Sequence, residues 1–312
     1  MYFISKQKED FTKYCTDYDA NLWLLQKSSI YMRYSDPFII NEDNMLLIGD
    51  VLYKFTNCTK DKIYNIPNKI STLSIDKAIY LPTEHNYYHC IVYCCSHLPY
   101  LKEYNLPIIA NENEILKYFN DNYFHLNILF TNDLKYEVEH LFILKHSGPF
   151  NNCLLDSFNK FAFDQFKGIF KEYESKRCKI YIKRLNERKI NNDGEFDKYL
   201  TEKGYLVLTL ENISIEEQIN YFKSAESVIG VHGAGLTNLI FTNSLCKIIE
   251  IKHRNMNLYK IHDCYKHLST LNNNIHYYQY YDSIVKLHNT KTKNYNIQID
   301  IKKFDTFLKN IG

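Results

Sequence analysis

Apolar and polar positions alternate regularly in the second half of the chain. Short apolar runs at residues 178–184 (CKIYIKR), 205–210 (YLVLTL), 227–231 (SVIGV) and 246–251 (CKIIEI) have the character of strands. The nearly unbroken apolar run at 205–210 is typical of a parallel strand covered on both faces. With helical segments between the runs, residues 178–251 predict a β-α-β-α-β-α-β series, which closes as a Rossmann-like doubly wound sheet.

The segments between these strands carry helix signals. Residues 193–204 predict a helix that ends on Gly204, the residue type that adopts the left-handed conformation after a helix. Residues 214–226 begin with a capping box of Ser214 and Glu217, which predicts a second helix. Its apolar stripe consists of Ile215, Ile219, Phe222 and Ala225. Residues 236–241 predict a short third helix.

The first half is less regular, and it predicts a second α/β domain. Residues 76–82, 125–130 and 139–144 are candidate strands, and residues 86–104, around Pro99, are a candidate helix. We expect a linker near residues 145–165. The stretch LNNNIHYYQYY at 271–281 resembles a loop, and residues 300–312 predict a closing helix with its apolar residues on one face.

The length of 312 residues agrees with two domains. We expect an N-terminal α/β acceptor-side domain at residues 1–155 and a Rossmann-like nucleotide-sugar-binding domain at residues 156–290. Residues 291–312 would form the closing C-terminal helix. The apolar fraction of 45% provides for a sizeable core, and 24% charged residues is ordinary for a globular protein.

Charge and cysteine usage narrow the function classes. The net charge is +2 and no block of arginine or lysine stands out, so a nucleic-acid partner is not expected. No run approaches the roughly 18 apolar residues that a membrane-spanning helix needs. The nine cysteines include no C-x-x-C pair and no export signal precedes them, which indicates reduced thiols and a soluble, cytoplasmic protein.

The stretch SAESVIGVHGAGLTNLIF at 224–241 concentrates three glycines in a chain that has only nine. Its VHGAG segment lies between a predicted parallel strand and a helix, where open α/β sheets bind ligands. Glycine lets the backbone approach a phosphate, and a helix start offers unpaired N–H groups. The alternative is a tight turn without a ligand. The pattern is not G-x-G-x-x-G, so it does not support a nicotinamide site.

Charged residues follow two of the predicted strands. Lys183 and Arg184 end the first strand and Arg188 lies in the loop after it, where the arginines could neutralise a diphosphate. Glu250 ends the last strand and could accept hydrogen bonds from a ribose diol. The alternative for the two arginines is a solvated charged loop, and for Glu250 it is a strand-end charge that faces water. His232 either donates to a phosphate oxygen or only braces its turn.

Taken together, residues 178–252 resemble glycosyltransferase family 61. The resemblance rests on YIKRLNERKINN, then EFDKYLTEKGYLVLTLENISIEEQINYFKSAESVIGVHGAGLTNLIF, then KIIEI, in the family's order. Earlier, NYYHCIVYCCSHLPYL resembles the family's histidine and Leu-Pro element. Cys90 stands there in place of the usual tryptophan, and the acidic residue expected shortly afterwards is absent.

The resemblance implies a GT-B-type fold of two Rossmann-like α/β domains with the nucleotide cleft between them. It implies an inverting, metal-independent hexosyl- or pentosyltransferase that moves sugar from a nucleotide-sugar donor, expected to be a UDP-sugar, to a hydroxyl on a glycan or glycoprotein. No other cofactor is expected. The nucleotide-sugar-binding residues would be Lys183, Arg184, Arg188, His232, Gly233, Ala234, Gly235, Leu236, Asn238 and Glu250, and the catalytic base would be His89.

Several alternatives remain open from the residues alone. Asp17 and Asp19 form a D-x-D pattern but do not follow an apolar strand, where a Mg²⁺ site beside phosphates would need them. Cys90, Cys94 and His97 could approach a zinc ion, but buried cysteines in a core helix are the favoured interpretation. The chain could be a catalytically inactive nucleotide-sugar or glycan binding module. A hydrolase would need a nucleophile elbow, and G-x-S-x-G is absent.

Overall fold

The protein is described by a computed structural model. It gives side chains at residues 71–83, 85–130, 135–143, 160–170, 177–186, 188–253, 263–274, 276–283 and 296–312, and backbone alone at 16–17, 22–31, 38–40, 46–48, 144, 157–159 and 284–285. The side chains of the DYD stretch at 17–19 lie outside the described residues. The chain divides into two compact units, residues 1–151 with 155–166 and residues 152–154 with 167–312. No helix among the described residues is long and apolar enough to cross a membrane.

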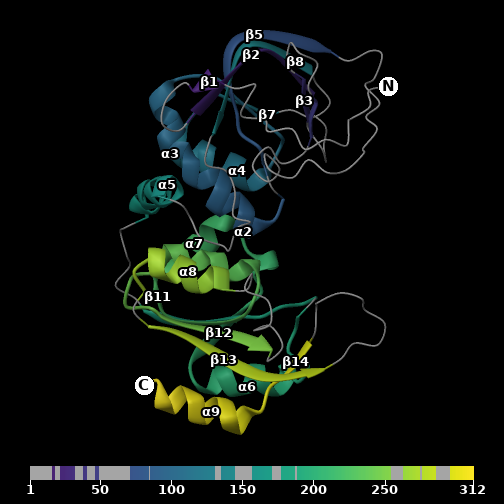
Figure 1. Ribbon diagram of the computed structural model, residues 1–312. Coiled ribbons are helices and arrows are strands. Elements are labelled where there is room, and N and C mark those ends of the chain that lie inside the picture. The colour runs from purple at the N-terminus through teal and green to yellow at the C-terminus, as the bar shows by residue number, and fades with distance from the viewer. Residues whose placement is uncertain are drawn as a thin grey trace. The chain divides into compact units, whose positions relative to one another are not determined.

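The first unit is built on a mixed sheet with the order β4-β3-β2-β8-β5-β6-β7 (Figure 1, purple to teal). Strands β8, β5, β6 and β7 are parallel, and β2, β3 and β4 join them antiparallel. The bounds are β1 Thr16–Asp17, β2 Leu22–Tyr31, β3 Phe38–Ile40, β4 Leu46–Ile48, β5 Thr72–Tyr80, β6 Ile108–Ala110, β7 Ile128–Phe130 and β8 Lys135–Leu144. The strands predicted at 76–82, 125–130 and 139–144 are therefore confirmed, with shifted ends.

The helix predicted at 86–104 is confirmed as one helical run that changes type along its length. Asn86 caps its start through Oδ1, which accepts from the amides of Tyr88 and His89. Hydrogen bonding changes from π to 3₁₀ just ahead of Pro99, whose nitrogen has no hydrogen to donate. The run comprises α2 Tyr87–His89, η2 Cys90–Cys94, η3 Cys95–His97, α3 Leu98–Leu101 and η4 Lys102–Tyr104.

The remaining helices of this unit are α4 Glu114–Phe119, η5 Asn120–Phe124 and α5 Ser157–Gly168. The last of these corrects the linker expected near residues 145–165. Ala162, Phe163 and Phe166 recur at helical spacing and are fully buried, so the second part of that segment packs as a helix.

The second unit is a parallel sheet with the order β10-β9-β11-β12-β13, to which β14 adds an antiparallel edge. Its strands are β9 Cys178–Ile182, β10 Tyr205–Leu208, β11 Ala225–Val231, β12 Lys247–His253, β13 Tyr277–Val285 and β14 Asn296–Gln298. Its helices are α6 Asp193–Glu202, η6 Leu210–Asn212, α7 Ile215–Lys223, η7 Ala234–Phe241, α8 Cys264–Leu271 and α9 Ile301–Asn310. Figure 1 shows α7 and α8 against one face of the sheet and α6 and α9 against the other. The series predicted for residues 178–251 is confirmed.

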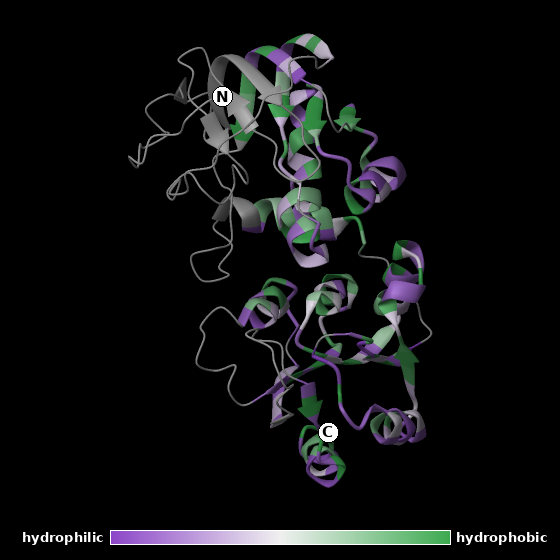
Figure 2. Cartoon of the chain, turned by 90° about the vertical axis from the view of Figure 1, so that its right-hand side faces the viewer, coloured by the Kyte–Doolittle hydropathy of each residue, from purple (hydrophilic) through white to green (hydrophobic). Residues whose placement is uncertain are grey.

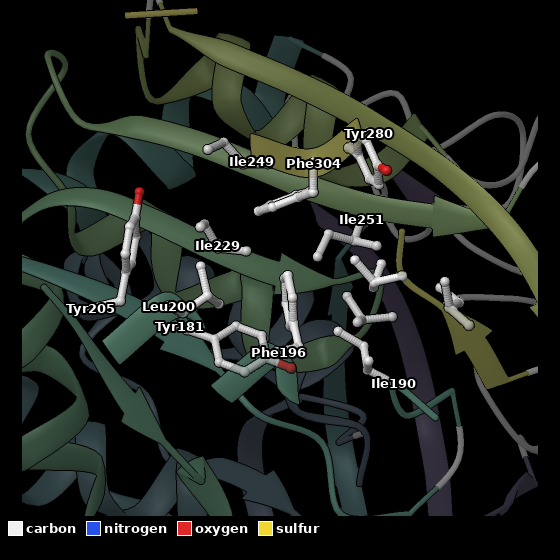
Figure 3. Close-up of a cluster of buried hydrophobic side chains, with 13 residues drawn as sticks. Tyr181, Ile190, Phe196, Leu200, Tyr205, Ile229, Ile249, Ile251, Tyr280 and Phe304 are labelled. Atoms are coloured by element: carbon white, nitrogen blue, oxygen red, sulfur yellow. The ribbon is translucent and has the colours of Figure 1, made fainter. Parts of the chain in front are cut away.

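The closing helix α9 completes the core of this unit. Helices α6 and α9 each carry a hydrophobic stripe, visible as green beside purple in Figure 2, and turn it toward the sheet. Phe304 of α9 is fully buried, with its ring centroid 5.1 Å from that of Phe196 and 4.8 Å from that of Tyr280 (Figure 3). The C-terminal residues are thus part of the fold that positions the sheet.

Three expectations for this unit need correction. Residues 205–210 are not a strand covered on both faces, because β10 is the edge of the sheet and leaves Leu206 45% exposed. Ala225 does not belong to the stripe of α7. That helix ends at Lys223, and Ala225 begins β11. The tyrosine-rich stretch at 271–281 is not a loop throughout, since it contains the start of β13, where aromatic residues suit a half-buried strand.

Candidate functional site

The candidate site lies where the strand order of the second unit reverses. Strands β9 and β11 are neighbours, although β10 separates them in the sequence, and Ile182 pairs with Gly230 near their carboxyl ends. Two loops leave the sheet at this point, residues 183–189 after β9 and residues 232–235 after β11. A reversal of this kind opens a crevice at the carboxyl edge of a parallel sheet, and ligands bind there.

Arg184 and Gly233 meet across this reversal. A Cβ atom added to Gly233 would stand 1.7 Å from Nη1 of Arg184. The backbone of Gly233 is extended, with φ 167° and ψ 167°, so the glycine is required for lateral space and not for its conformation. The glycine turn therefore seats the guanidinium of Arg184 directly on its backbone.

The rest of the turn is packed against the strand ends. A Cβ on Gly235 would lie 2.9 Å from Cδ1 of Leu210 and 3.2 Å from Cγ2 of Ile182, and one on Gly230 would lie 3.0 Å from Cδ2 of Leu236. In the turn itself, Ala234 and Gly235 retain partial exposure, and they begin η7. The first amides of a helix have no partner within it, so these two residues offer donors to a ligand.

Two residues that were predicted to bind the nucleotide sugar, Leu236 and Asn238, support this turn. Leu236 is buried and fills the space beneath Gly230. Asn238 is fully buried, and its Nδ2 donates to Oε1 of Gln218 at 2.9 Å and to the carbonyl of Gly235 at 3.3 Å. Gln218 in turn donates to the carbonyl of Leu210 at 3.1 Å. The described contacts of both residues are with the protein, and direct nucleotide contact by them stays a prediction.

Arg188 is held in an uncommon conformation close to the same point. Its φ is +59°, in the left-handed region that residues with a side chain rarely adopt. Its Nε is buried and has no hydrogen-bond partner among the residues that the structure describes. Its charge acts to lower the pKa of His232, His253 and Tyr265, which places it near all three. A buried guanidinium nitrogen without an acceptor costs free energy unless an anion accepts its hydrogen bond.

Lys183 is directed to α6. Its Nζ lies 2.5 Å from Oδ2 of Asp197 and 3.2 Å from Oδ2 of Asp193, and both carboxylates act to raise its pKa. The ion pairs account for the charge of Lys183 within the described residues. Its predicted nucleotide contact is not tested by this arrangement.

His232 is part of a buried polar network. Its Nδ1 lies 2.5 Å from Oε1 of Glu250, which has no exposed surface. Oε2 of Glu250 accepts from Nζ of Lys252 at 3.1 Å, from Nε2 of Gln279 at 3.2 Å and from the hydroxyl of Tyr277. Both carboxylate oxygens are therefore occupied from within the protein. The contact of Glu250 with a ribose stays a prediction. In the structure, Glu250 supports the ring of His232.

The network fixes which groups are charged. Burial lowers the pKa of His232, and Arg188 and Lys252 lower it further against the opposing effect of Glu250. Burial acts to raise the pKa of Glu250, but the contacts with His232, Lys252 and Tyr277 bring it below its ordinary value. Burial also acts against the charge of Lys252, whose pKa is nevertheless raised by Glu250 and Asp263. At neutral pH, Glu250 and Lys252 are ionised and His232 is neutral.

Sequence reasoning missed several residues that lie around His232. Lys252 and His253 are buried and end β12 directly after Glu250. Polar residues at the carboxyl end of a buried strand were the available signal. Tyr265 of α8, whose ring centroid is 5.1 Å from that of His232, and Tyr277 of β13 gave no such signal. Both come to the site through tertiary packing alone.

His89, the predicted base, belongs to the first unit. It is half-buried, and its ring stacks on Tyr93 with centroids 5.6 Å apart and meets the ring of Tyr88 edge-on at 5.3 Å. Burial lowers its pKa. A neutral imidazole is the form that accepts a proton, so the environment of His89 is compatible with a base.

The three residues considered for zinc each have a different partner. Sγ of Cys90 contacts Oδ1 of Asn113 at 3.3 Å, Sγ of Cys94 contacts the carbonyl of Pro82 at 3.2 Å, and Nδ1 of His97 contacts the carbonyl of Tyr93 at 2.6 Å. Within the part of the chain that the structure describes, no group of three or more His, Cys, Asp or Glu side chains is arranged around a common point.

Comparison with known proteins identifies the family. No curated protein matches the chain significantly. The model of the family described as Glycosyltransferase 61 matches residues 87–249, which include His89, both loops at the strand reversal and the glycine turn. The match spans more than half of the chain. The chain therefore belongs to glycosyltransferase family 61, whose members transfer sugars.

Proposed function

We propose that this glycosyltransferase moves a hexosyl or pentosyl group from a nucleotide-sugar donor, expected to be a UDP-sugar, to a hydroxyl of a glycan or glycoprotein. Transfer would proceed with inversion. The two units would correspond to the two Rossmann-like domains of a GT-B enzyme. The observation that carries this proposal is the packing of Arg184 on Gly233 at the strand reversal, together with the buried Nε of Arg188, which has no hydrogen-bond partner within the described part of the chain.

The diphosphate of the donor fits the charge and the donors at this point. Arg184 and Arg188 supply two positive charges, and the amides of Ala234 and Gly235 supply oriented N–H groups at the start of η7. The charge of Lys252 is matched inside the protein by Glu250 and Asp263, so it adds little to the field outside the network. The arginines would bind the diphosphate, with His232 as a further donor.

The same groups would assist departure of the nucleotide. As the bond between the anomeric carbon and the diphosphate breaks, the leaving group gains one negative charge. Guanidinium groups and helix amides fixed at that position stabilise the developing charge more than the starting charge. We therefore expect cationic side chains and helix amides to stabilise the leaving diphosphate, with no requirement for a metal.

Inversion requires a single displacement. The acceptor oxygen attacks the anomeric carbon from the side opposite the diphosphate, and its proton passes to a base. We assign this role to His89, whose lowered pKa leaves it neutral near pH 7. The proton lost by the acceptor hydroxyl is then balanced by the proton gained on the imidazole.

The test is a transfer assay with a panel of UDP-, GDP- and TDP-sugars, a broad set of glycan acceptors, and parallel reactions in EDTA. We expect transfer or slow donor hydrolysis with at least one donor, at the same rate with and without EDTA. Activity that EDTA abolishes and Mn²⁺ restores would overturn the metal-free mechanism and return attention to Asp17 and Asp19. Binding of a donor without transfer or hydrolysis would instead identify a binding module.

A further inference from the structure

We propose that Glu250 is a positioning residue that holds His232 with its hydrogen on Nδ1, so that an anionic phosphate at Nε2 binds only with uptake of a proton. The proposal rests on the proposed function, because the anion in question is the diphosphate of the donor. It assigns to Glu250 a role in orienting and polarising His232, and it makes donor binding dependent on pH.

The direction of the hydrogen bond follows from the network. An ionised carboxylate only accepts, and Glu250 is ionised because Lys252, Tyr277 and His232 all turn donors toward it. Nδ1 of His232 must therefore carry the hydrogen in the contact of 2.5 Å with Oε1. A neutral imidazole has a single N–H, so Nε2 of this tautomer carries a lone pair and no hydrogen.

That lone pair does not suit a phosphate. Phosphate oxygens accept hydrogen bonds, and two facing lone pairs repel each other. A proton taken from solvent by Nε2 converts His232 to an imidazolium that donates to Glu250 through Nδ1 and to the diphosphate through Nε2. The imidazolium then lies between two anions, the Glu250 carboxylate and the diphosphate, which both stabilise its positive charge. The pKa of His232 is therefore higher in the complex than in the free protein.

The sign of the pH dependence follows. Below the pKa of His232 in the free protein, the imidazolium is already present and binding takes up no proton. Above that pKa, the affinity falls by up to about tenfold per pH unit, because each binding event must add a proton. The fall ends where the pH exceeds the pKa of His232 in the complex. The free-protein value lies below the ordinary one because of burial, so the dependence begins below neutral pH.

Other ionisable groups surround His232, and nearly all have fixed charges near neutrality. Within the described residues, these ionisable groups are Glu250, Lys252 and His253 on β12, Tyr277 on β13, Tyr265 and Asp263 at α8, and Arg184 and Arg188 after β9. The pKa values of both tyrosines are raised, chiefly by burial, which keeps them neutral. His253 is the exception, because burial lowers its pKa as well. A variant of His253 therefore tests whether this residue, and not His232, takes up the proton when the nucleotide binds.

The first measurement needs no ligand. Long-range ¹H–¹⁵N correlation spectra distinguish the two neutral tautomers of histidine, and loss of one signal in His232→Gln assigns the residue among the 12 histidines. We expect the Nδ1–H form in the parental protein above neutral pH. In Glu250→Gln the tautomer preference should be lost, whereas Glu226→Gln, on β11 outside the network, should preserve it. An Nε2–H form in the parental protein would overturn the proposal, even if Glu250→Gln does not fold.

The second measurement is calorimetry with UDP, and with GDP where UDP does not bind. At pH 8 the terminal phosphate, with a pKa of about 6, is already ionised, so any proton taken up is gained by the protein. Titrations in buffers with different heats of ionisation give the number of protons. We expect uptake of up to one proton by the parental protein and by His253→Gln. We expect none by His232→Gln, whose amide donates without protonation and should retain measurable binding.

The outcomes separate this proposal from the proposed function. Nucleotide binding without proton uptake in the parental protein contradicts the proposal and leaves the nucleotide site intact. Uptake that persists in His232→Gln contradicts it as well, since the proton then belongs to another group. Failure of both UDP and GDP to bind overturns the nucleotide site itself and the proton uptake with it, while the tautomer spectra still decide the role of Glu250.

Discussion

The guanidinium of Arg184 occupies the space that a side chain on residue 233 would need, with Nη1 only 1.7 Å from the position of a Cβ atom on Gly233. Gly233→Ala should therefore displace Arg184 without straining the backbone, which is extended at this residue. We expect nucleotide affinity to fall by about tenfold to 100-fold, the value of a charge-assisted contact. Gly194→Ala is the matched control, because nothing lies within 4 Å of its added Cβ. Equal affinities of the two variants in calorimetry would contradict this arrangement.

Arg188 should contribute to nucleotide binding through its charge and not through its backbone conformation. Arg188→Gly relieves the left-handed conformation and removes the guanidinium, whereas Arg188→Ala removes it and keeps the strain. We expect both to lose about 1.5–3 kcal/mol of binding free energy and to slow transfer in parallel. Arg177→Ala, an exposed arginine at the start of β9, should leave both quantities unchanged. An affinity in Arg188→Gly equal to that of the parental protein would remove Arg188 from the site.

His89→Ala should separate chemistry from binding. The residue belongs to the first unit, so nucleotide affinity should remain while transfer falls by about 10²–10⁴-fold. A base must be unprotonated. The parental kcat, measured with saturating donor, should therefore rise as the pH passes upward through the lowered pKa of His89 and be level above it. Steady-state kinetics between pH 5 and 8 provide the measurement, and a His89→Ala enzyme with the parental rate would show that another group takes the proton.

Phe304→Ala tests the part played by the closing helix. The ring is fully buried between Phe196 and Tyr280, so its loss should cost about 3–5 kcal/mol of unfolding free energy. Urea denaturation with Leu245→Ala as the exposed control, at 62% exposure, measures the difference. If the two variants unfold at the same urea concentration, α9 is not part of the cooperative core.

The repeating strands and helices of the second unit were predictable because each carries its own signal. Ser214 and Glu217 form the capping box that begins α7, and Gly204 takes the left-handed conformation after α6, with φ +83°. The exposure of β10 was not predictable from its apolar residues, because an edge position depends on the order of strands. Strand β13 was hidden by the tyrosine and asparagine bias of the whole chain.

The candidate site was predictable only where its residues follow a strand in the sequence. Arg184, Arg188 and the glycine turn lie in the loops after β9 and β11, and the structure brings Arg184 and Gly233 together. Glu250 was assigned to a ribose because it ends a strand. In the structure its Oε2 accepts hydrogen bonds from Tyr277 and Gln279. Both residues lie on β13, which pairs with the strand of Glu250. No local pattern encodes that pairing, so the support of His232 by Glu250 became visible only in the fold.

The central claim is that a nucleoside diphosphate binds at the reversal between β9 and β11. The most direct test is the free energy of unfolding of the parental protein and of an Arg184→Ala, Arg188→Gly double variant, each with UDP and GDP at millimolar concentration. For a nucleotide present at 100 times its dissociation constant, the parental protein should gain about 2.7 kcal/mol, and the double variant should gain little at the same concentration. No gain by the parental protein with either nucleotide, or an equal gain by the double variant, would contradict the account.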